Sequence, residues 1–148
     1  MSKMNQEEIK AIIPHRDPFL LVDEIVEMTD DFVVGLKRVR PDKYYFKGHF
    51  PDEPMMPGVL IVESIAQTGA VCVLSRPEFR GRTAYFARIN QVRFRKKVIP
   101  GDVLRLEMQF TGIRGTIGSG LGKAFLKNGD LACSAELTFA VGEPREPK

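Results

Sequence analysis

The chain of 148 residues contains no tryptophan, two cysteines and two histidines. Cys72 and Cys133 stand alone, with no Cys-x-x-Cys pair, so neither a disulfide scaffold nor a zinc site is indicated. We expect two buried, reduced thiols in a cytoplasmic protein. Because only His15 and His49 are available, few arrangements for metal binding or histidine acid–base chemistry exist.

Long apolar runs are also missing. Residues 58–62 and 69–74 are the longest stretches, and neither approaches the roughly 18 residues of a membrane span. The amino terminus lacks the apolar segment of a signal peptide. With 43% hydrophobic and 28% charged residues, the composition is that of an ordinary globular protein. We expect one domain over residues 1–148, with 142–148 as a frayed tail.

The net charge of +3 conceals an uneven distribution of basic side chains. Residues 76–105 hold nine basic side chains against two acidic ones. Such a region attracts an acidic protein, nucleic acid or an anionic membrane. Lysine and arginine along a strand edge also discourage unwanted strand pairing. The charges alone leave both interpretations open and name no partner.

Hydrophobic periodicity predicts an α+β domain with one long helix. Asn5 and Glu8 form the pattern of a capping box, which opens a short helix before Pro14. Pro57 suits the first position of a longer helix. The apolar residues of that helix continue almost all round to Leu74, which is typical of a helix buried on most sides.

Strands are predicted on both sides of this helix. Their ranges are 19–29, 32–40, 84–89, 92–98, 103–110, 116–127 and 131–141. Asn128-Gly129 is a strong hairpin signal between the last two. Gly118, Gly120 and Gly122 share one face of their strand, where they admit a close neighbour such as the buried helix. We therefore expect an antiparallel sheet of about six strands wrapped around the helix.

The most informative segment is Lys47-Gly-His-Phe-Pro-Asp-Glu-Pro-Met-Met-Pro-Gly58. It places His49 in a proline-stiffened loop before the long helix. Glu63 lies within the apolar part of that helix, where a buried carboxyl group needs a partner or a proton, and Gln67 follows one turn later on the same face. Together with free amides at the helix start, these groups fit acid–base chemistry on a carbonyl compound. A structural histidine and a core carboxyl bonded to a backbone amide would leave the same pattern.

On these motifs the chain closely resembles the 3-hydroxyacyl-(acyl-carrier-protein) dehydratases of type II fatty-acid synthesis, the FabZ class of the hotdog fold. The matching blocks are Ile13-Pro-His-Arg-Asp-Pro-Phe-Leu-Leu-Val-Asp23, Gly48-His-Phe-Pro, Met56-Pro-Gly-Val-Leu, Glu63-Ser-Ile-Ala-Gln67 and Arg93-Phe-Arg-Lys-Lys-Val-Ile-Pro-Gly-Asp102. Ser64 stands where the family usually has Ala, and Asp17 where Tyr is common. Glu63 favours the dehydratase-only class, because Asp occupies this position in the sister class that also isomerises the double bond.

The resemblance implies that His49 and Glu63 are the catalytic residues, with His49 as the base for the C2 proton and Glu63 as the acid for the leaving hydroxyl group. It implies that the backbone N–H groups of Gly58 and Val59 polarise the thioester carbonyl and that Gln67 orients Glu63. No metal or redox cofactor is implied. In the family, the His and Glu of one site come from different protomers, so a homodimer is implied, and three dimers often assemble further.

The implied substrate carrier is acyl carrier protein, an acidic partner that holds the acyl chain on its phosphopantetheine arm. The basic region then serves as a docking surface, with Arg93, Arg95, Lys96 and Lys97 as candidates. No nucleic-acid or membrane partner is expected. Two alternatives stay open for the sequence: a hotdog-fold acyl thioesterase, and a non-enzymatic basic module that binds nucleic acid or an acidic protein.

Overall fold

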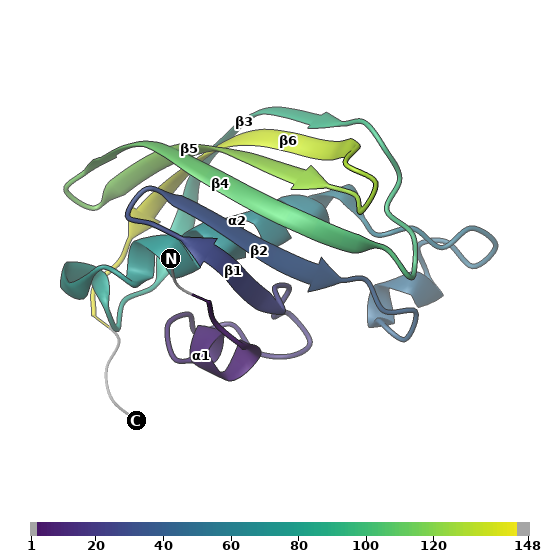
Figure 1. Ribbon diagram of the computed structural model, residues 1–148, viewed down its shortest axis with the longest axis horizontal. Coiled ribbons are helices and arrows are strands. Elements are labelled where there is room, and N and C mark those ends of the chain that lie inside the picture. The colour runs from purple at the N-terminus through teal and green to yellow at the C-terminus, as the bar shows by residue number, and fades with distance from the viewer. Residues whose placement is uncertain (1–2, 145–148) are drawn as a thin grey trace.

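A computed structural model describes residues 3–144 as an antiparallel sheet wrapped around a long helix (Figure 1). The helices are α1 (Gln6–Lys10) and α2 (Gly58–Leu74), and short 3₁₀ turns cover Tyr44–Lys47 and Pro77–Phe79. The strands are β1 (Glu24–Met28), β2 (Phe32–Arg38), β3 (Ala84–Phe94), β4 (Val103–Arg114), β5 (Ile117–Phe125) and β6 (Leu131–Val141). Their order across the six-stranded sheet is β1-β2-β4-β5-β6-β3, which confirms the predicted α+β architecture.

Helix α2 forms the centre of the core. Every residue from Ile61 to Leu74 is buried except Glu63, and the sheet arches over the helix in Figure 1. The helix begins at Gly58, one residue later than predicted, because Pro57 is extended at φ −56° and ψ 134°. Pro57 provides no side-chain cap, so the first amides of α2 keep their hydrogen-bonding capacity.

The segment before β1 differs from the prediction. The strand predicted over 19–29 is reduced to β1, at Glu24–Met28. The backbone groups of Phe19 and Leu21 bond instead to the side chain of Gln67 on α2. A side chain distant in the sequence thus takes the place of a neighbouring strand, and a local pattern of apolar residues cannot show this.

Strand β3 is the second departure. The sequence predicts two strands, 84–89 and 92–98, whereas the structure has a single strand with register shifts after Phe86 and after Asn90. Gln91 lies in the left-handed region at φ +52°, where it interrupts the alternation without ending the strand. In the part of the chain that the structure describes, β3 pairs with β6 alone and forms one edge of the sheet.

Three glycines of β5 face the interior, as predicted. Gly118, Gly120 and Gly122 are all buried. A Cβ atom on Gly122 would overlap Cγ2 of Ile65 on α2, whereas one on Gly120 would lie 2.7 Å from the backbone oxygen of Gln109. The close neighbour of Gly122 is therefore the central helix, as expected, and that of Gly120 is strand β4.

Several local predictions are confirmed. Asn5 and Glu8 form the capping box of α1, and Gly129 turns the chain between β5 and β6 at φ +95°. Both cysteines are buried and free. Burial raises the pKa of Cys72 and of Cys133 to about 11, so their thiols are poor nucleophiles at neutral pH.

The carboxyl-terminal segment after β6 is described only as far as residue 144. The N–H of Gly142 donates to the carbonyl oxygen of Thr83 at 2.8 Å. The rest of the tail predicted over 142–148, from residue 145 onward, lies outside the described residues. Among the helices that are described, none is long and apolar enough to cross a membrane.

Candidate active site

His49 lines a cavity of about 380 Å³ at the amino-terminal end of α2. The other lining residues are Phe50, Met55, Met56, Gly58, Val59, Ile61, Phe94, Lys96, Lys97 and Val98. The Nδ1 atom of His49 lies 2.9 Å from the carbonyl oxygen of Met55. Because a carbonyl oxygen only accepts, Nδ1 carries the proton in this contact. The Nε2 atom of the neutral ring therefore holds the basic lone pair.

The first backbone amides of α2 belong to the same cavity. Gly58 and Val59 both line it, and no acceptor among residues 3–144 is hydrogen-bonded to either N–H group. Unpaired donors at the positive end of a helix stabilise negative charge on a nearby carbonyl oxygen. A Cβ atom on Gly58 would lie 2.6 Å from Cε1 of Phe94, so glycine allows that ring to rest against the helix start.

Glu63 lies in a second, smaller cavity of about 180 Å³. Its other lining residues are His15, Ala66, Gln67, Ala70, Ala84, Tyr85, Phe86 and Phe139. The expectation of a buried carboxyl group is wrong, because this opening leaves the side chain of Glu63 18% exposed. Its Oε2 atom accepts a hydrogen bond from Nε2 of Gln67 at 2.9 Å, as their spacing indicates.

Gln67 connects Glu63 to the segment before β1. Its Oε1 atom accepts a hydrogen bond from the N–H of Leu21 at 2.7 Å, and its Nε2 atom donates to the carbonyl oxygen of Phe19 at 2.8 Å as well as to Glu63. The donor at Leu21 fixes which end of the amide is oxygen, so Nε2 faces Glu63. Because Gln67 is only 1% exposed, its amide is held in one orientation.

Replacing Gln67 is expected to destabilise the fold. Gln67→Leu leaves the buried N–H of Leu21 without a partner, at a cost of about 1–3 kcal/mol, whereas the carbonyl of the exposed Phe19 is able to bond to water. Ser64→Ala is the matched control on the same helix, because it removes only a bond to the carbonyl of Leu60 one turn earlier. Urea unfolding measures both, and equal midpoints for the two variants would contradict the expectation.

The two cavities are separate within one chain. Among the described residues, none lines both. The structure thus brings His49 together with Gly58 and Val59, and Glu63 together with Gln67, but it does not unite the two groups.

In the same part of the chain, no cluster of three or more His, Cys, Asp or Glu side chains is placed to hold a metal ion.

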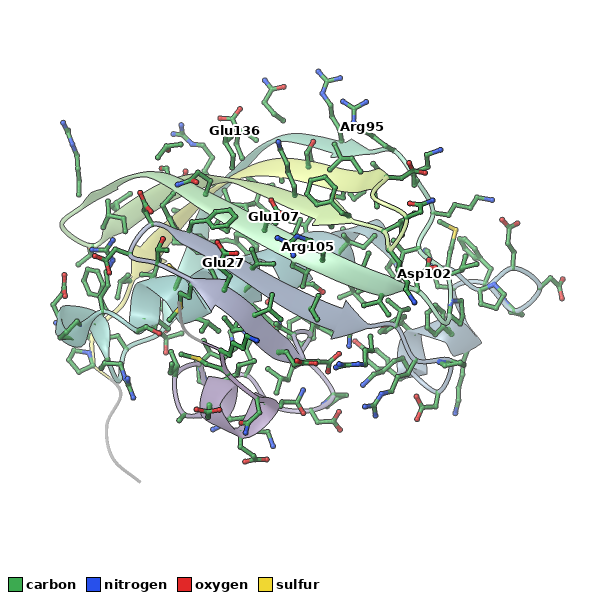
Figure 2. The ribbon with its side chains drawn as sticks, in the orientation of Figure 1. Glu27, Arg95, Asp102, Arg105, Glu107 and Glu136 are labelled. Carbon is green, nitrogen blue, oxygen red and sulfur yellow. The ribbon has the colours of Figure 1, made fainter. Side chains whose placement is uncertain are left out.

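The four basic residues predicted as a docking surface are exposed at the end of β3 and in the loop that follows it, namely Arg93, Arg95, Lys96 and Lys97. Figure 2 shows Arg95 at the β3 side of the sheet. Lys96 and Lys97 line the cavity of His49. Each lysine has an acidic neighbour: Lys96 lies 3.9 Å from Asp130, and Lys97 pairs with Glu53. The hydrogen bond from Lys97 lowers the pKa of Glu53.

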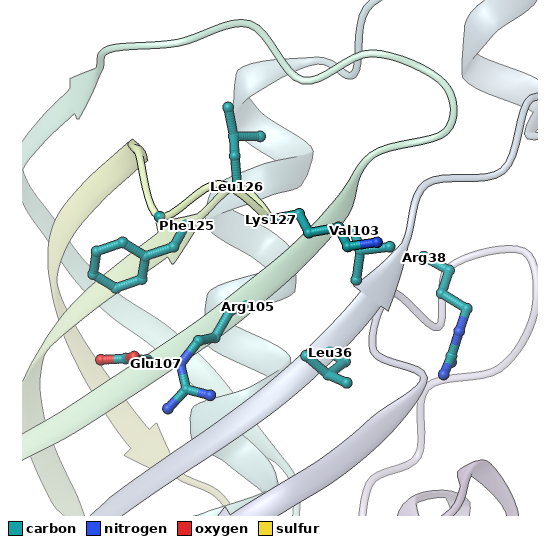
Figure 3. A pocket seen from close by; sticks show the side chains of 9 residues that line it. Leu36, Arg38, Val103, Arg105, Glu107, Phe125, Leu126 and Lys127 are labelled. Carbon is teal, nitrogen blue, oxygen red and sulfur yellow. Dashed lines mark hydrogen bonds and ion pairs between the residues drawn. The ribbon is translucent and has the colours of Figure 1, made fainter.

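A larger cavity, of about 570 Å³, lies on the outer face of the sheet (Figure 3). Its lining residues are Leu36, Arg38, Val103, Arg105, Glu107, Phe125, Leu126, Lys127 and Gly129. Arg105 pairs with Glu107 at 2.8 Å, and Arg38 pairs with Glu24. None of the site residues predicted from the sequence lies in this cavity, so its size does not make it the active site.

His15 is the site residue that sequence reasoning missed. It lines the cavity of Glu63, although the motif analysis assigns it no chemistry. Its rarity could have indicated a functional role, because it is one of two histidines in the chain. It also lies between Pro14 and Arg16 in a block that matches the family.

An antiparallel sheet wrapped around one long central helix is the hotdog fold. Among solved structures, the fold is similar to the dehydratase heterocomplex ApeI:P from Xenorhabdus doucetiae, with a TM-score of 0.75, 19% identity and 91% of each chain covered. It is also similar to a hypothetical thioesterase with coenzyme A from Streptococcus pneumoniae TIGR4, with a TM-score of 0.62, 19% identity, and 82% and 90% of the two chains covered. At these identities the likeness establishes the fold alone.

Sequence relatives establish the family. The FabA-like domain family matches residues 13–136. The chain is 53% identical to the 3-hydroxyacyl-[acyl-carrier-protein] dehydratase FabZ of Clostridium perfringens strain SM101, over 94% of this chain and 99% of that one. It is 54% identical to the FabZ of Bacillus cereus strain AH187, over 97% and 99%. The chain belongs to the FabA-like family and, within it, to the FabZ class of hotdog dehydratases.

Proposed function

We propose that this protein removes water from 3-hydroxyacyl chains on acyl carrier protein, with His49 as the base and Glu63 as the acid. As a member of the FabZ class it is a hydro-lyase, a 3-hydroxyacyl-[acyl-carrier-protein] dehydratase of fatty acid biosynthesis. The observation that carries the mechanism is the placement of the base and the acid in two cavities that border the same edge strand, β3.

Strand β3 borders both cavities, so pairing of two chains along β3 would bring a cavity of one chain next to a cavity of the other. Tyr85 and Phe86 near its start line the cavity of Glu63, and Phe94 at its end lines the cavity of His49. If two copies pair antiparallel along β3 about a twofold axis, the start of one strand lies beside the end of the other. The Glu63 cavity of one protomer then meets the His49 cavity of its partner.

The surface of β3 supports this pairing. Tyr85 is 59% exposed and Phe94 54% exposed, although both are large apolar side chains at a free sheet edge. Pairing covers such side chains and gives the edge its hydrogen bonds. The homodimer is therefore the minimum functional unit in this proposal, and a trimer of such dimers is the larger assembly that the family resemblance implies.

Dehydration requires the loss of a proton from C2 and of a hydroxyl group from C3. Nε2 of His49 takes the C2 proton, while Nδ1–H stays bonded to the carbonyl of Met55. The electron pair left on C2 forms the C2–C3 double bond as the C3–O bond breaks, and Glu63 protonates the departing oxygen to give water. The N–H groups of Gly58 and Val59 stabilise the charge that develops on the thioester oxygen. No resident cofactor enters this proposal.

The cavity of His49 is where the acyl carrier protein delivers its arm in this proposal. Its rim carries Lys96 and Lys97, and Arg93 and Arg95 lie next to them along the chain. Their exposed positive charge is complementary to an acidic carrier and speeds its approach. The phosphopantetheine arm then enters beside Phe94, toward the amides at the start of α2. Neither nucleic acid nor a membrane has a role here.

Hydration of a crotonyl thioester tests the proposal, because an enzyme accelerates a reaction in both directions. We expect the absorbance of the conjugated enoyl thioester to fall while a thiol-trapping reagent detects no free thiol. A thioesterase, which the fold also accommodates, gives the opposite result. Free thiol released with the C2–C3 double bond intact would refute the dehydratase assignment.

A further inference from the structure

His15 is a polar neighbour of Glu63 that takes no part in the proposed reaction steps. Its Nε2 atom lies 3.6 Å from Oε2 of Glu63, and both side chains line the same cavity. They are 22% and 18% exposed, so water screens this contact incompletely. The imidazole is therefore close enough to restrict where the carboxyl group of Glu63 lies.

The backbone on both sides of His15 is fixed. Nη1 of Arg16 donates to the carbonyl oxygens of Ile13 at 2.9 Å and of His15 at 2.7 Å, and Nη2 donates to that of Lys10 at 3.1 Å. The N–H of Phe19 then donates to the carbonyl oxygen of Arg16 at 2.8 Å. The guanidinium thus closes a turn that presents the His15 ring to the cavity.

The second nitrogen of the His15 ring has no structural role. Nδ1 is buried, and no hydrogen-bond partner for it lies among residues 3–144. A histidine that serves only packing has its buried ring nitrogens bonded to backbone or side-chain groups. The polar contact that the ring does make is with Glu63.

Both neighbours of the Glu63 carboxyl group approach the same oxygen atom. Gln67 donates to Oε2 at 2.9 Å, and Nε2 of His15 lies beside Oε2 as well. Within the described residues, Oε1 has no hydrogen-bond partner. The carboxyl group is therefore held at one oxygen and offers the other to a substrate.

We propose that His15 is a positioning residue that, together with Gln67, holds Oε2 of Glu63 so that Oε1 meets the C3 hydroxyl group. Gln67 restrains the carboxyl group from one side and His15 from another, so its plane does not rotate away from the substrate. This inference rests on the proposed role of Glu63 as the acid.

Two amide substitutions of His15 test the proposal. In His15→Gln the side-chain N–H₂ reaches the position of Nε2, whereas in His15→Asn it reaches only that of Nδ1. We expect kcat for crotonyl thioester hydration to fall about tenfold in His15→Asn, because the contact that positions the carboxyl group of Glu63 is lost, and to recover in His15→Gln. KM is expected to change by less than about twofold in both, because the contact acts on the reacting geometry rather than on substrate binding.

Further variants make the result decisive. His15→Leu fills similar space without a donor and repeats the loss seen in His15→Asn, while Asp17→Asn, an exposed neighbour, is the control and retains the wild-type kcat. Equal kcat values for His15→Gln and His15→Asn, or a change in KM alone, overturn the proposal. If the proposed role of Glu63 as the acid is wrong, Glu63→Gln is fully active. If Glu63→Gln is inactive but His15→Asn keeps the wild-type kcat, only the role of His15 is refuted.

Discussion

His49→Ala and Glu63→Gln are each expected to lower kcat for crotonyl thioester hydration by about 10²- to 10⁴-fold, the range for loss of a general acid or base. Alanine removes the basic Nε2 atom, and glutamine keeps the shape of Glu63 and an acceptor for Gln67 but has no acidic proton to transfer. Steady-state kinetics measure the loss, and urea unfolding verifies that each variant is folded. Full activity in either variant contradicts the role assigned to that residue.

Mixing these two inactive variants is expected to restore about one quarter of the wild-type activity, because a twofold dimer has two sites. After the subunits of an equal mixture exchange, half of the dimers are hybrids. Each hybrid has one site that combines the intact His49 of one chain with the intact Glu63 of the other, and one site that lacks both. If each chain instead built its own site from its own His49 and Glu63, no hybrid site would be intact and the mixture would stay inactive.

A reciprocal mixture provides the control for subunit exchange. The double variant His49→Ala/Glu63→Gln, mixed equally with the wild type, forms hybrids in which neither site is complete. The expected activity is again about one quarter of an all-wild-type sample, since only wild-type dimers work. Sites contained within single chains would give about one half, so the two mixtures together identify which chain supplies each group.

Gly122→Val is expected to lower the free energy of unfolding by about 1–3 kcal/mol, the usual cost of overpacking a core. The new Cβ atom would overlap Cγ2 of Ile65, and because Ile65 is completely buried, its side chain cannot turn away into solvent. Gly112→Val is the matched control on β4: its Cβ atom meets nothing within 4 Å, and valine favours strands. We expect Gly112→Val to leave stability unchanged or slightly raised.

Urea unfolding at one fixed protein concentration measures both glycine variants, since stability of an oligomer depends on concentration. A midpoint for Gly122→Val equal to that of Gly112→Val would show that the helix is able to withdraw from the sheet. A lower midpoint for Gly122→Val than for Gly112→Val would show that close packing between β5 and α2 contributes to the stability of the fold.

The parts of the fold that depend on local chemistry were predictable from the sequence. The apolar residues of α2, the Asn128-Gly129 turn and the inward glycines of β5 each follow from periodicity or backbone preference. The errors have long-range causes. Residues 19–23 resemble a strand, yet the backbone groups of Phe19 and Leu21 bond to Gln67, which lies more than forty residues away in the sequence.

For the candidate site, the residues alone indicate which groups are present, whereas only the family resemblance implies how they are divided between protomers. The spacing of Glu63 and Gln67 predicts their hydrogen bond, because both lie on one helix. The contact between Glu63 and His15 was not predictable, since it depends on how an irregular segment closes over α2. The separation of His49 from Glu63 within one chain does not follow from motif spacing; the family resemblance implies it, and the two separate cavities agree with it.

The edge formed by β3 also affects how readily a single chain aggregates. Within residues 3–144, strand β3 (Ala84–Phe94) pairs with β6 on one side only, so its other side presents unpaired backbone groups together with exposed aromatic side chains. Such an edge accepts any extended polypeptide, including unfinished copies of the same chain. Association with a partner copy in the proposed dimer would cover this edge, so we expect slow assembly to favour aggregation. If the proposed dimer dissociates in part, we expect turbidity before any loss of helix or sheet.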